Sequence, residues 1–209
     1  MQIAIPLYDR FTSLDAVGPY QVMTHLPGAQ IIFCAERPRG VCDESAALTL
    51  VAEAAYADVP DPDIIIVPGG PGQAAQMTPG PLRDWLTEAD KTTTWTTSVC
   101  TGSLILAAAG LLDGRQATTH WLAMDELARL GAKPQRQRYV FDGKYVTAAG
   151  VSAGIDMVLA LVARIAGDET AQRCQLAVEY DPRPPFDGDP YTAPPALAAS
   201  LRATSRFAR

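Results

Sequence analysis

The chain has 209 residues, of which 48% are hydrophobic, and its 17 basic and 23 acidic side chains give a net charge of −6. This length and apolar content suffice for one well-buried core. The acidic balance argues against a general surface for nucleic acid or anionic membranes.

The sequence also predicts neither a targeting segment nor a metal site. No basic stretch precedes an apolar run near the start, and no apolar run approaches the length of a membrane span, so we expect neither a secretion signal nor a transmembrane helix. The four cysteines show no Cys-x-x-Cys spacing and there are only two histidines, so we expect no metal and no cofactor. A reduced, cytoplasmic protein is the expectation that follows.

Segments of strand and helix character alternate along the chain. In chain order, we expect a strand over residues 3–8, a helix over 15–25 with Gly18-Pro19 in its first turn, a strand over 30–35, a loop over 38–44, strands over 47–52 and 63–68, a helix over 81–89, a strand over 92–99 and a helix over 101–111. An amphipathic helix over 121–130, strands over 138–141 and 145–148, and helices over 152–166 and 169–178 follow. Asp142-Gly143 is a hairpin signal, and the unbroken apolar run over 63–68 is typical of a parallel strand buried on both faces.

The end of the chain differs in composition from the rest. Residues 180–195 are rich in proline, aspartate and glycine, so we expect an extended or looped segment, and residues 196–209 can form a short helix. We expect one domain over residues 1–195 and a C-terminal tail over 196–209. The alternation of apolar strands with helices predicts an α/β fold, a three-layer αβα sandwich around a mostly parallel sheet.

Cys100 lies between a predicted strand and a predicted helix, in Ser98-Val99-Cys100-Thr101-Gly102. A sharp strand-to-helix turn exposes a nucleophile, and the first N–H groups of the helix face whatever the sulfur attacks. The partial positive charge of a helix N-terminus also favours a thiolate. We therefore expect an accessible, ionised nucleophile; the alternative is that this cysteine, like most free ones, is a small buried apolar residue.

Gly69 and Gly70 follow the apolar strand that ends at Pro68, and in a parallel sheet their loop emerges at the same edge as Cys100. Glycine allows the backbone to approach a substrate closely. We expect an N–H of Gly69 or Gly70, with that of Thr101, to bind the reacting group beside the sulfur. The alternative is a simple turn after a strand. The spacing does not match the G-x-G-x-x-G of nucleotide sites.

Asp15 and His120 are the polar candidates for a partner of the cysteine. Asp15 heads a predicted helix, where it can act as an N-cap, but the same edge of the sheet also places it near Cys100. A carboxyl group buried beside an anionic sulfur has a raised pKa and can donate a proton or orient water. A Cys-His pair through His120 is the other possibility, although Thr119 can cap a helix at Trp121 and His120 can simply pack there.

Together these motifs resemble the ThiJ/PfpI superfamily, whose flavodoxin-like fold is shared with class I glutamine amidotransferase domains. The resemblance runs from residue 3 to about residue 195, and within the superfamily the motifs are most similar to those of the isonitrile hydratases. The matching segments are residues 14–20, 67–70, 97–103, 117–121, 172–176 and 179–180, with the proline-rich residues 182–186 and 192–194.

Three positions separate this chain from other members of the superfamily. Ser98 replaces the first glycine of the amidotransferase elbow, and Thr101 replaces the histidine that usually follows the cysteine in peptidase-like and deglycase-like members. Asp15 stands where many members have glutamate. The isonitrile hydratases resemble this chain in having aspartate at that position. The related AraC-type regulators continue into a helix-turn-helix domain, for which we expect no room after Tyr180.

The resemblance implies hydration of an isonitrile, R–N≡C, to the formamide R–NH–CHO. Cys100 would form a thioimidate, Asp15 would deliver the proton and then activate water, and Thr101, Gly69 and Gly70 would hold the reacting group. It also implies a homodimer, with an isonitrile and water as the small-molecule partners and no nucleic acid or membrane. The alternatives are a cysteine-based redox or ligand sensor and a glyoxalase- or deglycase-like enzyme. Tyr20, Trp121 and Phe186 are candidate residues for the wall of the pocket.

Overall fold

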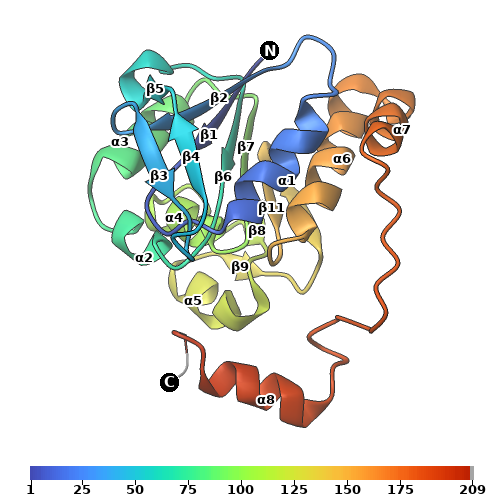
Figure 1. The fold of residues 1–209 in the computed structure, drawn as a ribbon. Helices are drawn as coiled ribbons and strands as arrows, with labels where there is room; N and C mark the ends of the chain where they lie inside the picture. Colours follow the sequence, from blue (N-terminus) through green and yellow to red (C-terminus); the bar gives the residue numbers. More distant parts are fainter. Residues whose placement is uncertain (208–209) are drawn as a thin grey trace.

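The computed structural model describes residues 1–207 and is organised around one seven-stranded sheet (Figure 1). The order of its strands is β10-β11-β7-β6-β1-β2-β5, and all neighbours are parallel except β10, which runs antiparallel to β11. The strands are β1 (Gln2–Pro6), β2 (Gln30–Ala35), β3 (Arg39–Cys42), β4 (Thr49–Ala52), β5 (Ala54–Ala55), β6 (Ile64–Val67), β7 (Trp95–Val99), β8 (Gln116–Ala117), β9 (Lys133–Pro134), β10 (Tyr139–Asp142) and β11 (Tyr145–Ala148).

Helices cover both faces of this sheet. The helices of the described residues are α1 (Ser13–Met23), α2 (Gln73–Gln76), α3 (Pro81–Ala89), α4 (Gly102–Ala108), α5 (Met124–Arg129), α6 (Ala153–Ala166), α7 (Asp168–Ala177) and α8 (Pro195–Ala203), with short 3-10 turns η1 (Tyr56–Asp58) and η2 (Trp121–Ala123); α8 lies apart from the sheet (Figure 1). The helices α1, α6 and α7 contact one another on one side, and α2, α3 and α5 contact α4 on the other (Figure 1). The expected three-layer α/β sandwich is therefore confirmed.

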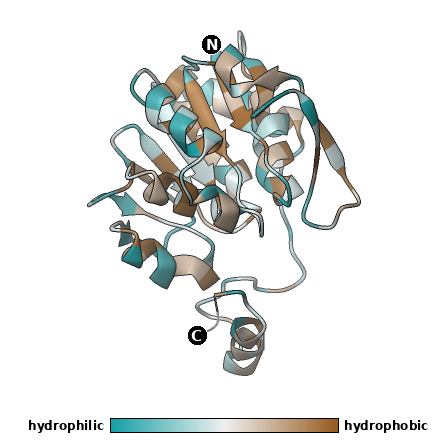
Figure 2. Cartoon of the chain, turned by 90° about the vertical axis from the view of Figure 1, so that its left-hand side faces the viewer, coloured by the Kyte–Doolittle hydropathy of each residue, from teal (hydrophilic) through white to brown (hydrophobic). Residues whose placement is uncertain are grey.

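The core lies along the central strands. All four residues of β6 have no exposed surface, as expected for a parallel strand covered on both faces. Figure 2 shows these hydrophobic strands at the centre, between helices whose outer surfaces are largely hydrophilic. The hairpin predicted at Asp142-Gly143 joins β10 and β11, with Gly143 at a φ of 61°. Apolar patterning thus fixes the middle of the fold.

Several boundaries differ from the prediction. The loop expected over residues 38–44 contains β3, because Val41 is buried and pairs with Leu50 of β4 despite the neighbouring Gly40. The helix expected to begin at Asp15 begins at Ser13, so Pro19 lies in its second turn rather than its first. The predicted helix over 121–130 is divided into η2 and α5, and that over 101–111 ends at Ala108. The short elements α2, β5, β8 and β9 had no prediction.

After α7 the chain leaves the layered body, passes through residues 180–194 without regular structure, and forms α8 (Figure 1). Both the looped segment and the short helix match the sequence prediction. A domain boundary near residue 195 stays a prediction. No described helix combines the length and apolar character needed to cross a membrane.

Candidate active site

Cys100 occupies a strained turn between β7 and α4. Its φ is 56°, in the left-handed region that residues other than glycine rarely adopt. The backbone is held on both sides: its N–H donates to the carbonyls of Ala148 (3.1 Å) and Ala149 (2.9 Å), and its carbonyl accepts from Ser103 Oγ and Thr119 Oγ1, both at 3.0 Å. The sharp turn expected from the sequence is therefore present, and neighbouring loops fix it.

The thiol itself is not exposed. Only 5% of Cys100 is accessible, so the expectation of an accessible side chain is wrong. Burial and the nearby Asp15 charge raise the pKa of the Cys100 thiol, while the N–H groups of Val151 and Thr101 and the charge of Arg206 lower it. Because burial is the largest of these effects, the resting side chain is a thiol rather than the expected thiolate.

Asp15 lies beside this thiol and is completely buried. Its Oδ2 accepts a hydrogen bond from Gly69 N–H at 2.8 Å, and it does not cap α1, which begins two residues earlier. Burial raises the pKa of Asp15 to about 7, against the lowering effects of Gly69 N–H and of the Cys100 thiol. Its Oδ1 is buried and has no partner at hydrogen-bond distance among the described residues, although the thiol is close enough to affect the carboxyl pKa.

The two groups therefore work as a coupled pair. Near neutral pH the carboxyl group of Asp15 loses its proton before the Cys100 thiol does, since the pKa of the thiol is raised further. The pair then holds one proton, which can pass from the sulfur to the carboxylate. The carboxyl group can thus receive the thiol proton and later return it.

The two glycines have a different role from the expected one. Gly69 N–H donates to Asp15, and Gly70 N–H donates to Thr101 Oγ1 at 3.1 Å, so neither N–H is free for a substrate. A Cβ on Gly69 would lie 2.5 Å from the backbone nitrogen of Thr101 and 2.9 Å from Asp15 Oδ2. Gly69 therefore permits the close approach of Asp15 and Thr101.

His120 is not paired with the cysteine. Its Nδ1 accepts the N–H of Leu122 at 3.3 Å and caps η2, the position that the sequence assigned to Thr119. The ring lies against Gly150, where an added Cβ would be 2.7 Å from His120 Cδ2. Burial lowers the pKa of the imidazole, so His120 is neutral. The contacts of this ring are those of a structural residue.

Sequence reasoning missed three groups that surround Cys100. Tyr8 is buried and donates its hydroxyl to the Pro68 carbonyl at 2.7 Å, and Val151 directs its N–H at the sulfur. Both follow the carboxyl ends of sheet strands, β1 and β11, so their place could have been predicted. Arg206 reaches the site from the end of the chain, and no local pattern indicates it.

A cavity of about 1120 Å³ lies between the layered body and the looped residues after α7. Trp121, Phe186 and Val151 are among its lining residues, whereas Cys100 is not. Two of the three predicted wall residues therefore line this cavity; Tyr20 instead packs against Phe33, with ring centroids 5.3 Å apart. Val151 connects the cavity to the thiol.

Within residues 1–207, no three His, Cys, Asp or Glu side chains are grouped so that they could hold a metal ion. The four cysteines are all unpaired.

Comparison with known proteins finds an enzyme and a transcriptional regulator among the similar sequences. The chain is 42% identical over 203 residues to the isonitrile hydratase of Pseudomonas putida, which covers 97% of this chain and 89% of that enzyme. It is 37% identical over 113 residues to the HTH-type transcriptional regulator CdhR of Pseudomonas aeruginosa, covering 52% of this chain and 33% of the regulator.

Solved structures and family models agree with this placement. A ThiJ/PfpI family protein from Pseudomonas syringae superposes with a TM-score of 0.93 at 38% identity, covering 97% of this chain and 84% of that one. Drosophila melanogaster DJ-1beta has a TM-score of 0.77 at 17% identity, over 85% of this chain and 97% of that one, and shares the fold. The DJ-1/PfpI family model matches residues 1–164. The chain is therefore a member of the DJ-1/PfpI family.

Proposed function

We propose that this protein is an isonitrile hydratase, which adds water to R–N≡C and releases R–NH–CHO through a covalent adduct on Cys100. The observation that carries the proposal is the buried pairing of the Cys100 thiol with the Asp15 carboxyl group. The 42% identity to the Pseudomonas putida enzyme over nearly the whole chain supports the same reaction.

The first step matches what this pair can supply. The terminal carbon of an isonitrile has no leaving group, so a nucleophile adds to it only if a proton is delivered to the same carbon. The Asp15 carboxylate takes the proton of the Cys100 thiol and passes it to that carbon while the sulfur attacks. One S–H bond breaks, one C–H and one C–S bond form, and the product is the thioimidate R–N=CH–S–Cys100.

Hydrolysis of the thioimidate uses the carboxylate a second time. Asp15, ionised again, accepts a proton from water as the oxygen adds to the thioimidate carbon, and passes that proton to the nitrogen. The tetrahedral adduct R–NH–CH(OH)–S–Cys100 then breaks its C–S bond, and its hydroxyl proton passes through Asp15 to the departing sulfur. The formamide leaves, and the thiol and the carboxylate are restored.

The remaining site residues position this pair. Gly69 N–H holds one oxygen of Asp15, and the other oxygen, Oδ1, has no hydrogen-bond partner among the described residues and is the one available to carry the proton. Thr101 and Val151 direct N–H groups at the sulfur and favour the thiolate as it forms. Gly70 fixes the Thr101 hydroxyl. The binding role proposed for the glycines thus becomes a positioning role, and the reaction as written needs no metal or cofactor.

We also propose that the enzyme is a cytoplasmic homodimer without nucleic-acid partners. A homodimer and the absence of nucleic-acid partners follow from the superfamily resemblance and the net charge of −6. A cytoplasmic location agrees with four unpaired cysteines.

Formamide production decides the function. Purified protein is incubated with cyclohexyl isonitrile and with an aryl isonitrile, and N-substituted formamide is measured beside the consumption of methylglyoxal. We expect formamide from the isonitriles, and none from the Cys100→Ala variant. Consumption of methylglyoxal without formamide production would contradict the proposal and favour a glyoxalase-like enzyme.

A further inference from the structure

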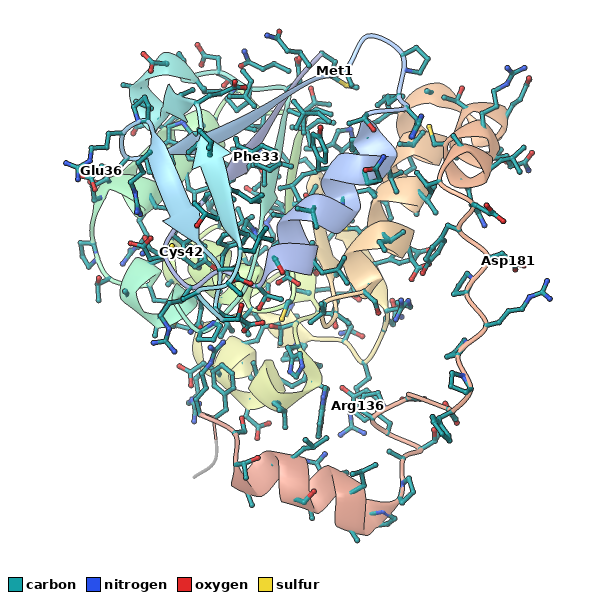
Figure 3. All side chains as sticks on the ribbon, in the orientation of Figure 1. Met1, Phe33, Glu36, Cys42, Arg136 and Asp181 are labelled. Atoms are coloured by element: carbon teal, nitrogen blue, oxygen red, sulfur yellow. The ribbon has the colours of Figure 1, made fainter. Side chains whose placement is uncertain are left out.

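The last 28 described residues form an arm, residues 180–207, that leaves the body and returns to it. The outward part is exposed, as at Asp181, which is labelled in Figure 3. Two cation–π contacts join the arm to the body. Arg136, labelled in Figure 3, lies 4.9 Å from the Tyr191 ring centroid. Arg202 of α8 lies 4.9 Å from the ring centroid of Trp121. These contacts bring the end of the arm back to the sheet edge that carries Cys100.

Arg206 is the residue that the arm places in the site. Its guanidinium donates to the Gly70 carbonyl at 3.0 Å and to Thr101 Oγ1 at 3.3 Å, while the residue itself remains exposed. The next residue, Phe207, packs against the core, with its ring 4.9 Å from the guanidinium carbon. Two hydrogen bonds and one apolar contact thus hold a cation beside the residue that follows the nucleophile.

The charge of Arg206 acts on Cys100 and not equally on Asp15. Cys100, Tyr8 and Glu44 favour the charged guanidinium, while burial and Arg10 oppose it. Arg206 in turn lowers the pKa of Cys100, whereas the groups that shift the pKa of Asp15 are Gly69, Cys100 and Glu44. The positive charge therefore acts on the sulfur more than on the carboxyl group.

That asymmetry matters for the first step of the reaction. When the thiol proton moves to Asp15, the total charge of the pair is unchanged but the negative charge moves onto the sulfur. A cation nearer the sulfur lowers the free energy of that transfer, because it stabilises the negative charge that forms there. We propose that Arg206 is a positioning residue that favours proton transfer from Cys100 to Asp15, so that the nucleophile is activated when the arm closes on the site.

Alkylation of Cys100 tests this inference without any isonitrile. The protein is treated with iodoacetate or iodoacetamide, which are similar in size but differ in charge, and labelling of the Cys100 peptide is measured by mass spectrometry. The ratio of the two rates reports the local positive charge and not access, because opening the site affects both reagents. Exposed Cys42 is an internal reference in the same samples.

The variants separate the charge from the structure of the arm. In Arg206→Met we expect the iodoacetate-to-iodoacetamide ratio at Cys100 to fall several-fold, because only the anionic reagent is attracted by the guanidinium. Arg206→Lys should keep most of the ratio, and Arg173→Met, which removes an exposed cation of α7 outside the arm, should leave it unchanged. An unchanged ratio in Arg206→Met would overturn the inference.

Turnover is measured on the same variants and rests on the proposed function. We expect kcat for formamide production to fall about tenfold or more in Arg206→Met, to be largely restored by lysine, and to change little in Arg173→Met. If wild-type protein makes no formamide while the alkylation ratio still depends on Arg206, the proposed function fails and the inference about Arg206 stands.

Discussion

The turn at Cys100 and the C-terminal arm both contribute residues to the site, but the turn is buried and rigidly held whereas the arm is exposed. The turn is buried, and four hydrogen bonds fix the backbone of a residue with a φ of 56°. The arm is largely exposed, has no regular structure over residues 180–194, and reaches the site through Arg206. The reacting groups thus lie on rigid elements, while a residue that adjusts their charge lies on a segment with few contacts.

This comparison predicts that substitutions at the turn abolish the reaction and that substitutions on the arm reduce it. Among substitutions that leave Cys100 in place, the largest effect should come from Asp15→Asn in α1, because asparagine keeps the shape but cannot carry the proton. We expect kcat/KM for an isonitrile to fall about 10³-fold or more. His120→Asn is the matched control, since its imidazole caps η2, and it should lose less than about tenfold. A larger loss in the histidine variant would restore the Cys-His reading.

Low pH should reduce the activity for the same reason as Asp15→Asn, because it removes the Asp15 carboxylate. The pKa of Asp15 is about 7, and the carboxylate is the form that accepts the thiol proton. Protonation below this pH removes that form, so kcat/KM should fall about tenfold per pH unit and about 100-fold by pH 5. Steady-state rates on a neutral isonitrile measure this profile. Activity that rises as the pH falls below 7 would show that Asp15 acts only as an acid.

Close packing at Gly69 should have a smaller but clear effect. The Cβ of Gly69→Ala would meet Thr101 and Asp15 at less than 3.0 Å, so one of them must move, and we expect kcat to fall about 10- to 100-fold. Gly188→Ala on the arm is the control, because an added Cβ there has no neighbour within 4 Å. Equal activities of the two variants would mean that the Asp15–Gly69 contact does not matter for the reaction.

The smallest effect is expected on the arm. Phe207→Ala removes the apolar contact next to Arg206 but leaves the guanidinium, so the arm should close less often, and we expect kcat to fall about two- to fivefold. The melting temperature should stay within about 1 °C of wild type, since Phe207 lies at the end of the chain. A loss as large as that of Asp15→Asn would show that the arm is as essential as the turn.

The sequence predicts the turn at Cys100 but not the contribution of the C-terminal arm to the site. An apolar β-branched run identifies β6, a threonine-rich segment of strand character identifies β7, and the segment after Val99 identifies the turn at Cys100, because these signals are local. The ionisation of Cys100 could not be predicted, since it depends on burial by distant segments. For the same reason the role of Gly69 was misread: its partner, Asp15, is 54 residues away in the chain. Arg206 is a single basic residue, and only the path of the arm brings it to the site.

The most direct test of the central claim is the mass of Cys100 during turnover. Wild-type protein is mixed with a slowly hydrated isonitrile, quenched in acid within the first turnover, digested and analysed by mass spectrometry. The Cys100–Asp15 pair predicts an adduct on the Cys100 peptide equal to the full mass of the isonitrile, because the thiol adds without a leaving group. Continued formamide production by Cys100→Ala, with no adduct in the wild type, would contradict it.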